Sequence, residues 1–214
     1  MTREASRGEL GGVVLFGPPT AGKDTISVSL AGLDQRFGQL TKVKVGSGRT
    51  AGYRVATSGE LAALRRAGRL VLETERYGNT YAVDRADLEA MREDGRVPLI
   101  HLGSVSHLRT FRAAVGEPWL CVLLWVPRDV CRHRSLGRGD RDTGDRLAAW
   151  DEALADVATA DAAEDMFHLL IRTDQVDADK AAEIVAQAYA DSPWAHTPSG
   201  ELSAFLRDGS RTGG

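Results

Sequence analysis

The chain has 214 residues, of which 43% are hydrophobic and 27% charged. This size suits one α/β domain with a single core and is too small for a second full domain beside it. Its net charge of -3 argues against a dedicated nucleic-acid-binding protein, which normally presents a strongly basic face. No apolar run approaches the ~18 residues needed to span a bilayer, so we expect a cytoplasmic protein with no membrane or nucleic-acid partner.

Short apolar segments alternate with amphipathic ones along most of the sequence. Continuous apolar segments indicate strands buried on both faces, and a spacing of three to four residues indicates helices. The expected strands are 11–17, 40–45, 53–57, 69–75, 97–103, 119–126 and 166–173, and the expected helices are 23–33, 58–68, 84–95, 104–116, two helices within 127–160 interrupted by a loop at 137–145, and 177–191. This alternation predicts a largely parallel sheet covered by helices on both faces.

The segment "GPPTAGKDT", residues 17–25, follows the first strand and opens the first helix. It matches most of the phosphate-binding pattern G-x-x-x-x-G-K-[ST]. In such a loop the backbone N–H groups surround phosphate oxygens, the helix contributes its positive end, and the lysine neutralises the β and γ oxygens. The predicted ATP-binding residues are therefore Gly17, Pro18, Pro19, Thr20, Ala21, Gly22, Lys23, Asp24 and Thr25.

Asp24 stands where the pattern has a magnesium-binding hydroxyl, and Thr25 follows one place late. One interpretation is that Asp24, with Thr25 beside it, supplies an oxygen ligand for Mg²⁺. The other is that Asp24 is a first-turn residue that favours the helix dipole, worth ~0.3–1 kcal/mol.

Several further motifs follow the loop in order: "SGELAALRRAGRL", "YGNTYAV", "DRADLEAMREDGRV", and "VPRDVCRHRSLGRGD" running into "DRLAAWDEAL". Together with the loop, they make residues 11–191 resemble the guanylate kinase family of P-loop phosphotransferases. The resemblance implies a three-layer α/β P-loop NTPase fold with a parallel sheet, an acceptor-binding subdomain at about 46–83 and a lid at about 134–146. A polar lead at 1–10 and a flexible tail at 192–214 would flank this domain, and "ELSAFL" within the tail could form a short docking helix.

The resemblance also implies roles for individual residues. Lys23 would bind the phosphates of ATP, Tyr81 and Arg49 would bind the acceptor phosphate, and the second arginine that the family has after Arg49 is missing. The lid arginines, whose planar charged groups suit a transferring phosphoryl group, would be Arg134, Arg138 and Arg146. ATP and Mg²⁺ are the implied cofactors, and a small phosphorylated substrate is the implied partner.

The acceptor pocket departs from the guanylate kinase pattern. Leu72 aligns with the guanine-reading glutamate, and "HLG" at 101–103 replaces an acidic strand end. We expect the neighbouring Glu73 and Glu75, together with His101 and Ser104, to contact the acceptor. A guanine N–H left without an acceptor would cost ~1–3 kcal/mol, so guanine specificity is not expected. The segment "HLGS" and the G-K-D loop resemble features of the ribose 1,5-bisphosphate phosphokinases. This resemblance implies a pocket for a sugar phosphate, which in this chain would be lined by His101, Ser104, Ser106 and His107.

The leading hypothesis is an ATP-dependent kinase that phosphorylates the phosphate of a small phosphomonoester, either a nucleoside monophosphate or a sugar phosphate. Two alternatives remain open. One is a ribose 1,5-bisphosphate phosphokinase-like or specialised-pathway nucleotide kinase. The other is a non-catalytic guanylate kinase-like binding module, against which the loop lysine and the lid arginines speak.

Overall fold

The structure, a computed structural model, describes residues 10–48, 50–76, 78–159, 164–191 and 201–210. Its centre is a five-stranded sheet in the order β2-β7-β1-β8-β9, in which every pairing is parallel. The strands are β1 (Val13–Phe16), β2 (Phe37–Gln39), β7 (Val97–Leu102), β8 (Leu120–Trp125) and β9 (Leu169–Arg172). The predicted parallel sheet is confirmed, and β2, a three-residue edge strand, was not predicted.

Side chains of the central strands alternate between two hydrophobic cores. Val14 and Phe16 of β1 belong to one core, and Val13 and Leu15 to the other. All four are fully buried, because the sheet is covered on both faces. The continuous apolar run at the start of the chain is thus explained by burial on both sides.

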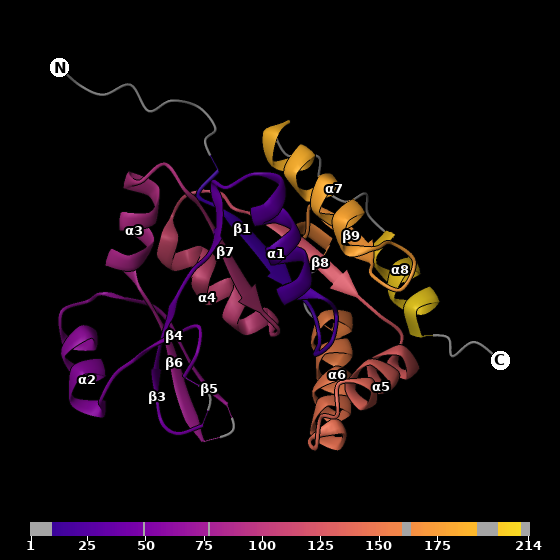
Figure 1. Cartoon of the computed structure of the whole chain (residues 1–214), viewed down its shortest axis with the longest axis horizontal. Helices are drawn as coiled ribbons and strands as arrows, with labels where there is room; N and C mark the ends of the chain where they lie inside the picture. Colours follow the sequence, from indigo (N-terminus) through magenta and orange to yellow (C-terminus); the bar gives the residue numbers. More distant parts are fainter. Residues whose placement is uncertain (1–9, 49, 77, 160–163, 192–200, 211–214) are drawn as a thin grey trace.

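Two groups of helices cover these faces (Figure 1). On one face, α1 (Lys23–Leu33) and α7 (Ala178–Ala190) pack together through residues such as Leu30 and Val185. The other face is covered by α3 (Arg85–Glu93), α4 (Val105–Val115), α6 (Thr143–Thr159) and α8 (Glu201–Ser210). The result is the predicted three-layer α/β fold. Within the described ranges, no helix is both long and apolar enough to cross a membrane.

A second sheet lies below the first in Figure 1 and has the order β4-β3-β6-β5. Its strands are β3 (Lys42–Val45), β4 (Tyr53–Val55), β5 (Leu70–Arg76) and β6 (Asn79–Asp84), and α2 (Ser58–Arg66) packs on one face. The small sheet therefore begins at Lys42, slightly before the expected subdomain boundary. The start of α2 is a capping box in which Thr57 and Glu60 bond reciprocally.

Asp84 joins the small sheet to the rest of the molecule. Its carboxylate is fully buried and accepts hydrogen bonds from Arg54 at 2.7 Å, from Arg69 at 2.9 and 2.6 Å, and from the backbone N–H of Ala86 at 3.2 Å. Burying a carboxylate is costly unless it is paired and hydrogen-bonded, and here both conditions are met. This cluster fixes the small sheet at the start of α3.

The predicted lid coincides with the end of α5 (Arg128–Gly137), the connecting loop and the start of α6. Residues 201–210 of the tail, which we expected to be flexible, form α8. Its Leu202 and Leu206 are 3% and 6% exposed and belong to the same core as Trp150 of α6. The short docking helix suggested by "ELSAFL" therefore forms, because its two leucines, four residues apart, share one helix face.

We expect Leu206→Ala to lower the free energy of unfolding by about 2 kcal/mol or more, because it removes a buried side chain from the main core. Chemical denaturation measures this change. Ser203→Ala, on the exposed side of the same helix, is the control and should change stability by less than ~0.5 kcal/mol. Equal effects of the two substitutions would show that α8 does not dock on the core.

Candidate active site

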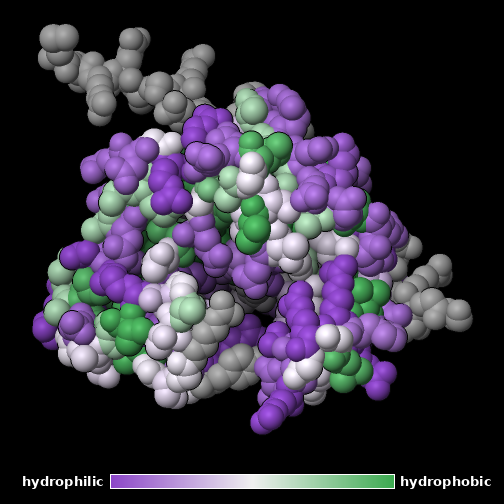
Figure 2. Space-filling model, viewed as in Figure 1, coloured by the Kyte–Doolittle hydropathy of each residue, from purple (hydrophilic) through white to green (hydrophobic). Residues whose placement is uncertain are grey.

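A cleft of about 910 Å³ opens where β1 and β7 end, between the small sheet and α6. Figure 2 shows the hollow between the part built from β3 to β6 and the part built from α5 and α6. Parallel strands bring their carboxyl ends to one edge, and ligands of open α/β sheets bind there. Every residue of the predicted loop, 17–25, lines this cleft.

Two glycines of the loop occupy positions where a side chain would clash or where φ is positive. A Cβ at Gly17 would come within 2.2 Å of the carbonyl oxygen of Leu124, and Gly22, the N-cap of α1, has a left-handed φ of 87°. Thr20 also has a positive φ, 60°, which is strained for a β-branched residue. Its hydroxyl is buried, and no residue in the described parts of the chain bonds to it. A strained loop with an unpartnered hydroxyl at a helix N-terminus is suited to receive an anion.

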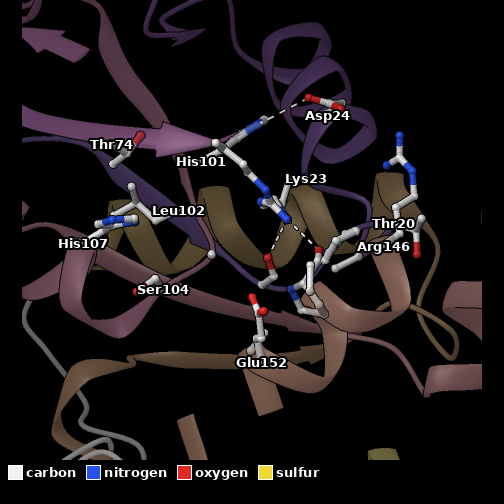
Figure 3. Close-up of a pocket in the computed structure, with 18 of the residues that line it drawn as sticks. Thr20, Lys23, Asp24, Thr74, His101, Leu102, Ser104, His107, Arg146 and Glu152 are labelled. Carbon is white, nitrogen blue, oxygen red and sulfur yellow. Dashed lines mark hydrogen bonds and ion pairs between the residues drawn. The ribbon is translucent and has the colours of Figure 1, made fainter. Parts of the chain in front are cut away.

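Lys23 folds back over the loop that carries it. Its Nζ donates hydrogen bonds to the carbonyl oxygens of Gly17 at 2.6 Å and Pro18 at 2.7 Å, drawn as dashed lines in Figure 3. Burial lowers the pKa of Lys23 to about 8, against an ordinary value of 10.5, and nearby Asp24 offsets only part of this effect. The ammonium group is thus held in the cleft by neutral carbonyls, and a bound phosphate would stabilise its charge.

Asp24 lies at the mouth of the loop beside His101, the residue near the end of β7. The Asp24 Oδ1 and His101 Nδ1 atoms are 3.4 Å apart, and Ser27 Oγ lies 2.8 Å from His101 Nε2. Burial lowers the pKa of His101, so the ring is neutral at pH 7. A neutral ring that donates from Nδ1 to Asp24 and accepts from the Ser27 hydroxyl fits these contacts and leaves the carboxylate charged.

The site offers Mg²⁺ a donor set of the kind it prefers. The Asp24 side chain is 84% exposed and lines the cleft next to Lys23, as does Thr25. In the described part of the chain, no cluster of three or more His, Cys, Asp or Glu residues could hold a metal ion. Mg²⁺ usually keeps several waters and binds one or two carboxylates together with substrate phosphates, so a single exposed carboxylate is compatible with it.

The three predicted lid arginines differ in their positions. Arg138 and Arg146 line the cleft, and Arg146 lies 3.1 Å from Asp140 and 2.9 Å from Asp142. Arg134 is not among the lining residues. Its guanidinium donates to the carbonyl oxygen of Thr20 at 3.0 Å and to the hydroxyl and carbonyl of Thr173 at 3.1 and 2.5 Å. These contacts fix the loop and the end of β9, and they favour a positioning role for Arg134 over the catalytic role expected.

On the acceptor side, Tyr81 of β6 lines the cleft as expected and packs against Tyr53 with ring centroids 5.3 Å apart. The Nζ of Lys44 lies 5.7 and 5.8 Å from the centroids of the two rings. Glu75 and Ser104 also line the cleft. Arg49, the other expected acceptor residue, lies outside the described residues.

Glu73 is not part of the cleft, although it was predicted to bind the acceptor. It pairs in register with Ala82, whose side chain packs under α2, and its carboxylate lies 2.6 Å from Arg65 of α2. Thr74 is the neighbour that lines the cleft, opposite Tyr81. The carboxylate of Glu73 is thus held toward α2, while Thr74 and Glu75, further along β5, line the cleft.

Several residues that line the cleft were not predicted from sequence: Lys42, Tyr53, Thr74, Arg76, Asp142, Ala149, Glu152, Ala153 and Asp156. Figure 3 shows Glu152 below Lys23, with Thr74, Ser104 and His107 to one side and Arg146 to the other. The helical spacing of 149, 152, 153 and 156 could have placed these four on one face of α6. Nothing in the sequence says that this face meets the loop.

Comparisons with known proteins show the fold. The structure is similar to that of a guanylate kinase from Anaplasma phagocytophilum, with a TM-score of 0.60 and 16% identity over 86% of each chain. A shikimate kinase from Acinetobacter baumannii in complex with shikimate has a TM-score of 0.46 and 16% identity, over 85% of this chain and 93% of the other. The sequence matches no protein-family model and no curated protein. The similarity to the guanylate kinase structure shows that the chain has a guanylate kinase-like P-loop kinase fold, as the motifs predicted.

Lys42 makes the free energy of unfolding depend on pH, and its lowered pKa gives the direction of this dependence. Burial lowers its pKa to about 8 in the folded protein, from 10.5. Between these values the unfolded chain holds a proton that the folded protein has lost, so the contribution of Lys42 to stability rises with pH. Near pH 7.5 the group is charged in both states and its burial destabilises the fold.

We therefore expect Lys42→Met to raise the free energy of unfolding at about pH 7.5, and we expect this gain to shrink at about pH 9.5. Urea denaturation of both proteins at the two pH values measures the difference. Lys180→Met is the control, because Lys180 is exposed and paired with Glu183. A gain for Lys42→Met that is independent of pH would contradict the lowered pKa.

Proposed function

We propose that this protein is an ATP-dependent kinase that transfers the γ-phosphoryl group to the phosphate of a small phosphomonoester. The observation that carries the proposal is that one cleft is lined by the Lys23 loop, by Tyr81 of the small sheet and by two lid arginines. Phosphoryl transfer requires positioning and charge neutralisation, and these residues supply both.

Different residues of the cleft would bind ATP, orient the acceptor and stabilise the transferring group. The N–H groups of the loop and Lys23 would hold the ATP phosphates, while Tyr81 would orient the acceptor phosphate. Arg138 and Arg146 would stabilise the charge of the transferring group, with Arg146 exchanging its carboxylate partners for phosphate oxygens. Mg²⁺, when bound near Asp24 and Thr25, would neutralise the β and γ oxygens. Closing α5 and α6 over the cleft would exclude water and limit hydrolysis of ATP.

A sugar phosphate is favoured as the acceptor over a guanine nucleotide. Thr74, Ser104 and His107 offer short hydrogen-bonding side chains to the cleft, which suit a hydroxyl-rich ligand. Glu73 is paired with Arg65 outside the cleft, and Leu72 is buried in the core, so neither is available to read a guanine edge. This supports the ribose 1,5-bisphosphate phosphokinase-like alternative.

The test is formation of ADP by purified protein with ATP, Mg²⁺ and a panel of GMP, dGMP and ribose 1,5-bisphosphate. We expect turnover above the acceptor-free background, greatest with the sugar phosphate, and a loss of about 100-fold or more in Lys23→Ala. The exposed-site variant Lys180→Ala should keep full activity. ATP that neither binds nor turns over would favour the non-catalytic binding module.

Asp24 gives a separate prediction. If its carboxylate holds Mg²⁺, we expect Asp24→Asn to raise the Mg²⁺ concentration for half-maximal activity by about tenfold or more, because Mg²⁺ binds charged oxygen ligands best. A Mg²⁺ titration at saturating ATP measures this. Asp34→Asn makes the same change at the other end of α1 and should leave the requirement unaltered. A change of less than about twofold in Asp24→Asn would support the helix-dipole interpretation.

A further inference from the structure

Lys42 is a half-buried lysine whose ammonium group is withdrawn from water, and the reaction proposed above gives it no role. It begins β3, where the chain passes from the large sheet into the small one, and it lines the cleft. Its Nζ donates a 2.8 Å hydrogen bond to the backbone carbonyl of His101. In the part of the chain that the structure describes, no carboxylate pairs with it. A buried cation with only a neutral partner is costly, and an anion in the cleft would offset the cost.

Several other basic groups lie close enough to repel this charge. Lys42 contributes to the lowered pKa values of Lys23, His101 and His107, and Arg76 contributes to those of Lys23 and His107. Burial is the larger cause in each case. Basic groups are therefore gathered between the loop and the small sheet, where Asp24 and Asp156 offset part of their charge. Such a group of cations favours the binding of a polyanion.

The strand register places Lys42 on the acceptor side of this region. Lys42 pairs with Tyr53, and Lys44 pairs with Tyr81, so the two lysines and two tyrosines share one face of the small sheet. Lys44 is occupied, because its Nζ donates to the carbonyl of Ser47 at 2.6 Å and lies over the tyrosine rings. Lys42 is the lysine of this pair that the cleft lining includes.

We propose that Lys42 binds the phosphate of the acceptor, a dianionic phosphomonoester, at a subsite between Lys23 and Tyr81. The proposal rests on the proposed function, since it names a residue of the same cleft. Its ammonium group would exchange the His101 carbonyl for phosphate oxygens, a charge-assisted contact stronger than the one it replaces. Lys42 would thereby supply a positive charge in the place of the missing second acceptor arginine.

The test uses inorganic phosphate as the probe for the acceptor phosphate. Calorimetric titrations of phosphate into the wild-type protein and Lys42→Met are made with saturating ADP and Mg²⁺, so that the loop is already filled. We expect Lys42→Met to weaken phosphate binding by about tenfold to a hundredfold, as for loss of a charged hydrogen bond, and to leave the affinity for ADP and Mg²⁺ within about threefold. Lys180→Met is the matched control and should bind phosphate as the wild type does.

A second pair of titrations separates this proposal from the proposed function. Phosphate is titrated without nucleotide into Lys23→Met and into Lys23→Met/Lys42→Met, in which the loop lysine is absent. Failure of the wild type to bind ADP would overturn the kinase, while this pair would still report on Lys42. Equal phosphate affinities with and without Lys42 would overturn the subsite, and so would a wild type with no saturable phosphate binding. Cooperative unfolding of each variant shows that it is folded.

Discussion

The position of every cleft residue depends on how tightly the end of β1 is held between β7 and β8. The strand is fully buried, pairs in parallel on both sides, and ends at Gly17, where a Cβ would collide with the Leu124 carbonyl. The chain must therefore turn away from the sheet at this point, and α1 begins six residues later. That turn is the predicted phosphate-binding loop, and the neighbouring strand ends bring His101 beside it.

The electrostatics of the cleft follow from the same constraint. Lys23 begins helix α1 and Lys42 begins β3 of the small sheet, yet both place their ammonium groups at this edge and both donate to backbone carbonyls. Carbonyl dipoles stabilise a buried cation only partly, and for this reason both pKa values fall to about 8. A cost of this kind is expected where a site is organised in advance for a polyanion.

The Asp24 and His101 pair gives the departure from the loop pattern a structural context. The carboxylate that the strand end lacks is present on the loop, and the histidine that replaces it contacts that carboxylate and is itself anchored by Ser27. The acid therefore lies on the loop, at Asp24, and its hydrogen-bonding partner lies at the strand end, at His101. Asp24 or His101 considered alone would look like a departure from the motif without a structural reason.

Local sequence patterns predicted most of the fold. Apolar runs gave the buried strands β1, β7 and β8, and the spacing of glycine and lysine gave the loop, because these signals depend on residues near one another in the chain. The short strand β2 was missed, since three residues at a sheet edge carry little periodicity. Of the two glutamates predicted to bind the acceptor, Glu75 lines the cleft and Glu73 does not, because Glu73 pairs with Arg65 of α2, a contact that the strand pattern does not show.

The sequence by itself therefore determined the glycine- and lysine-containing loop, the alternation of strands and helices, and some of the basic residues that could bind a phosphate. Only the tertiary structure decided which polar side chains face the cleft. In it Arg134 contacts the loop and Thr173, Glu73 pairs with α2, and Lys42 lies at the edge where β7 ends and bonds to the carbonyl of His101. The physical reason is that a side chain's partners come from distant segments, and the packing of two sheets against their helices fixes those contacts.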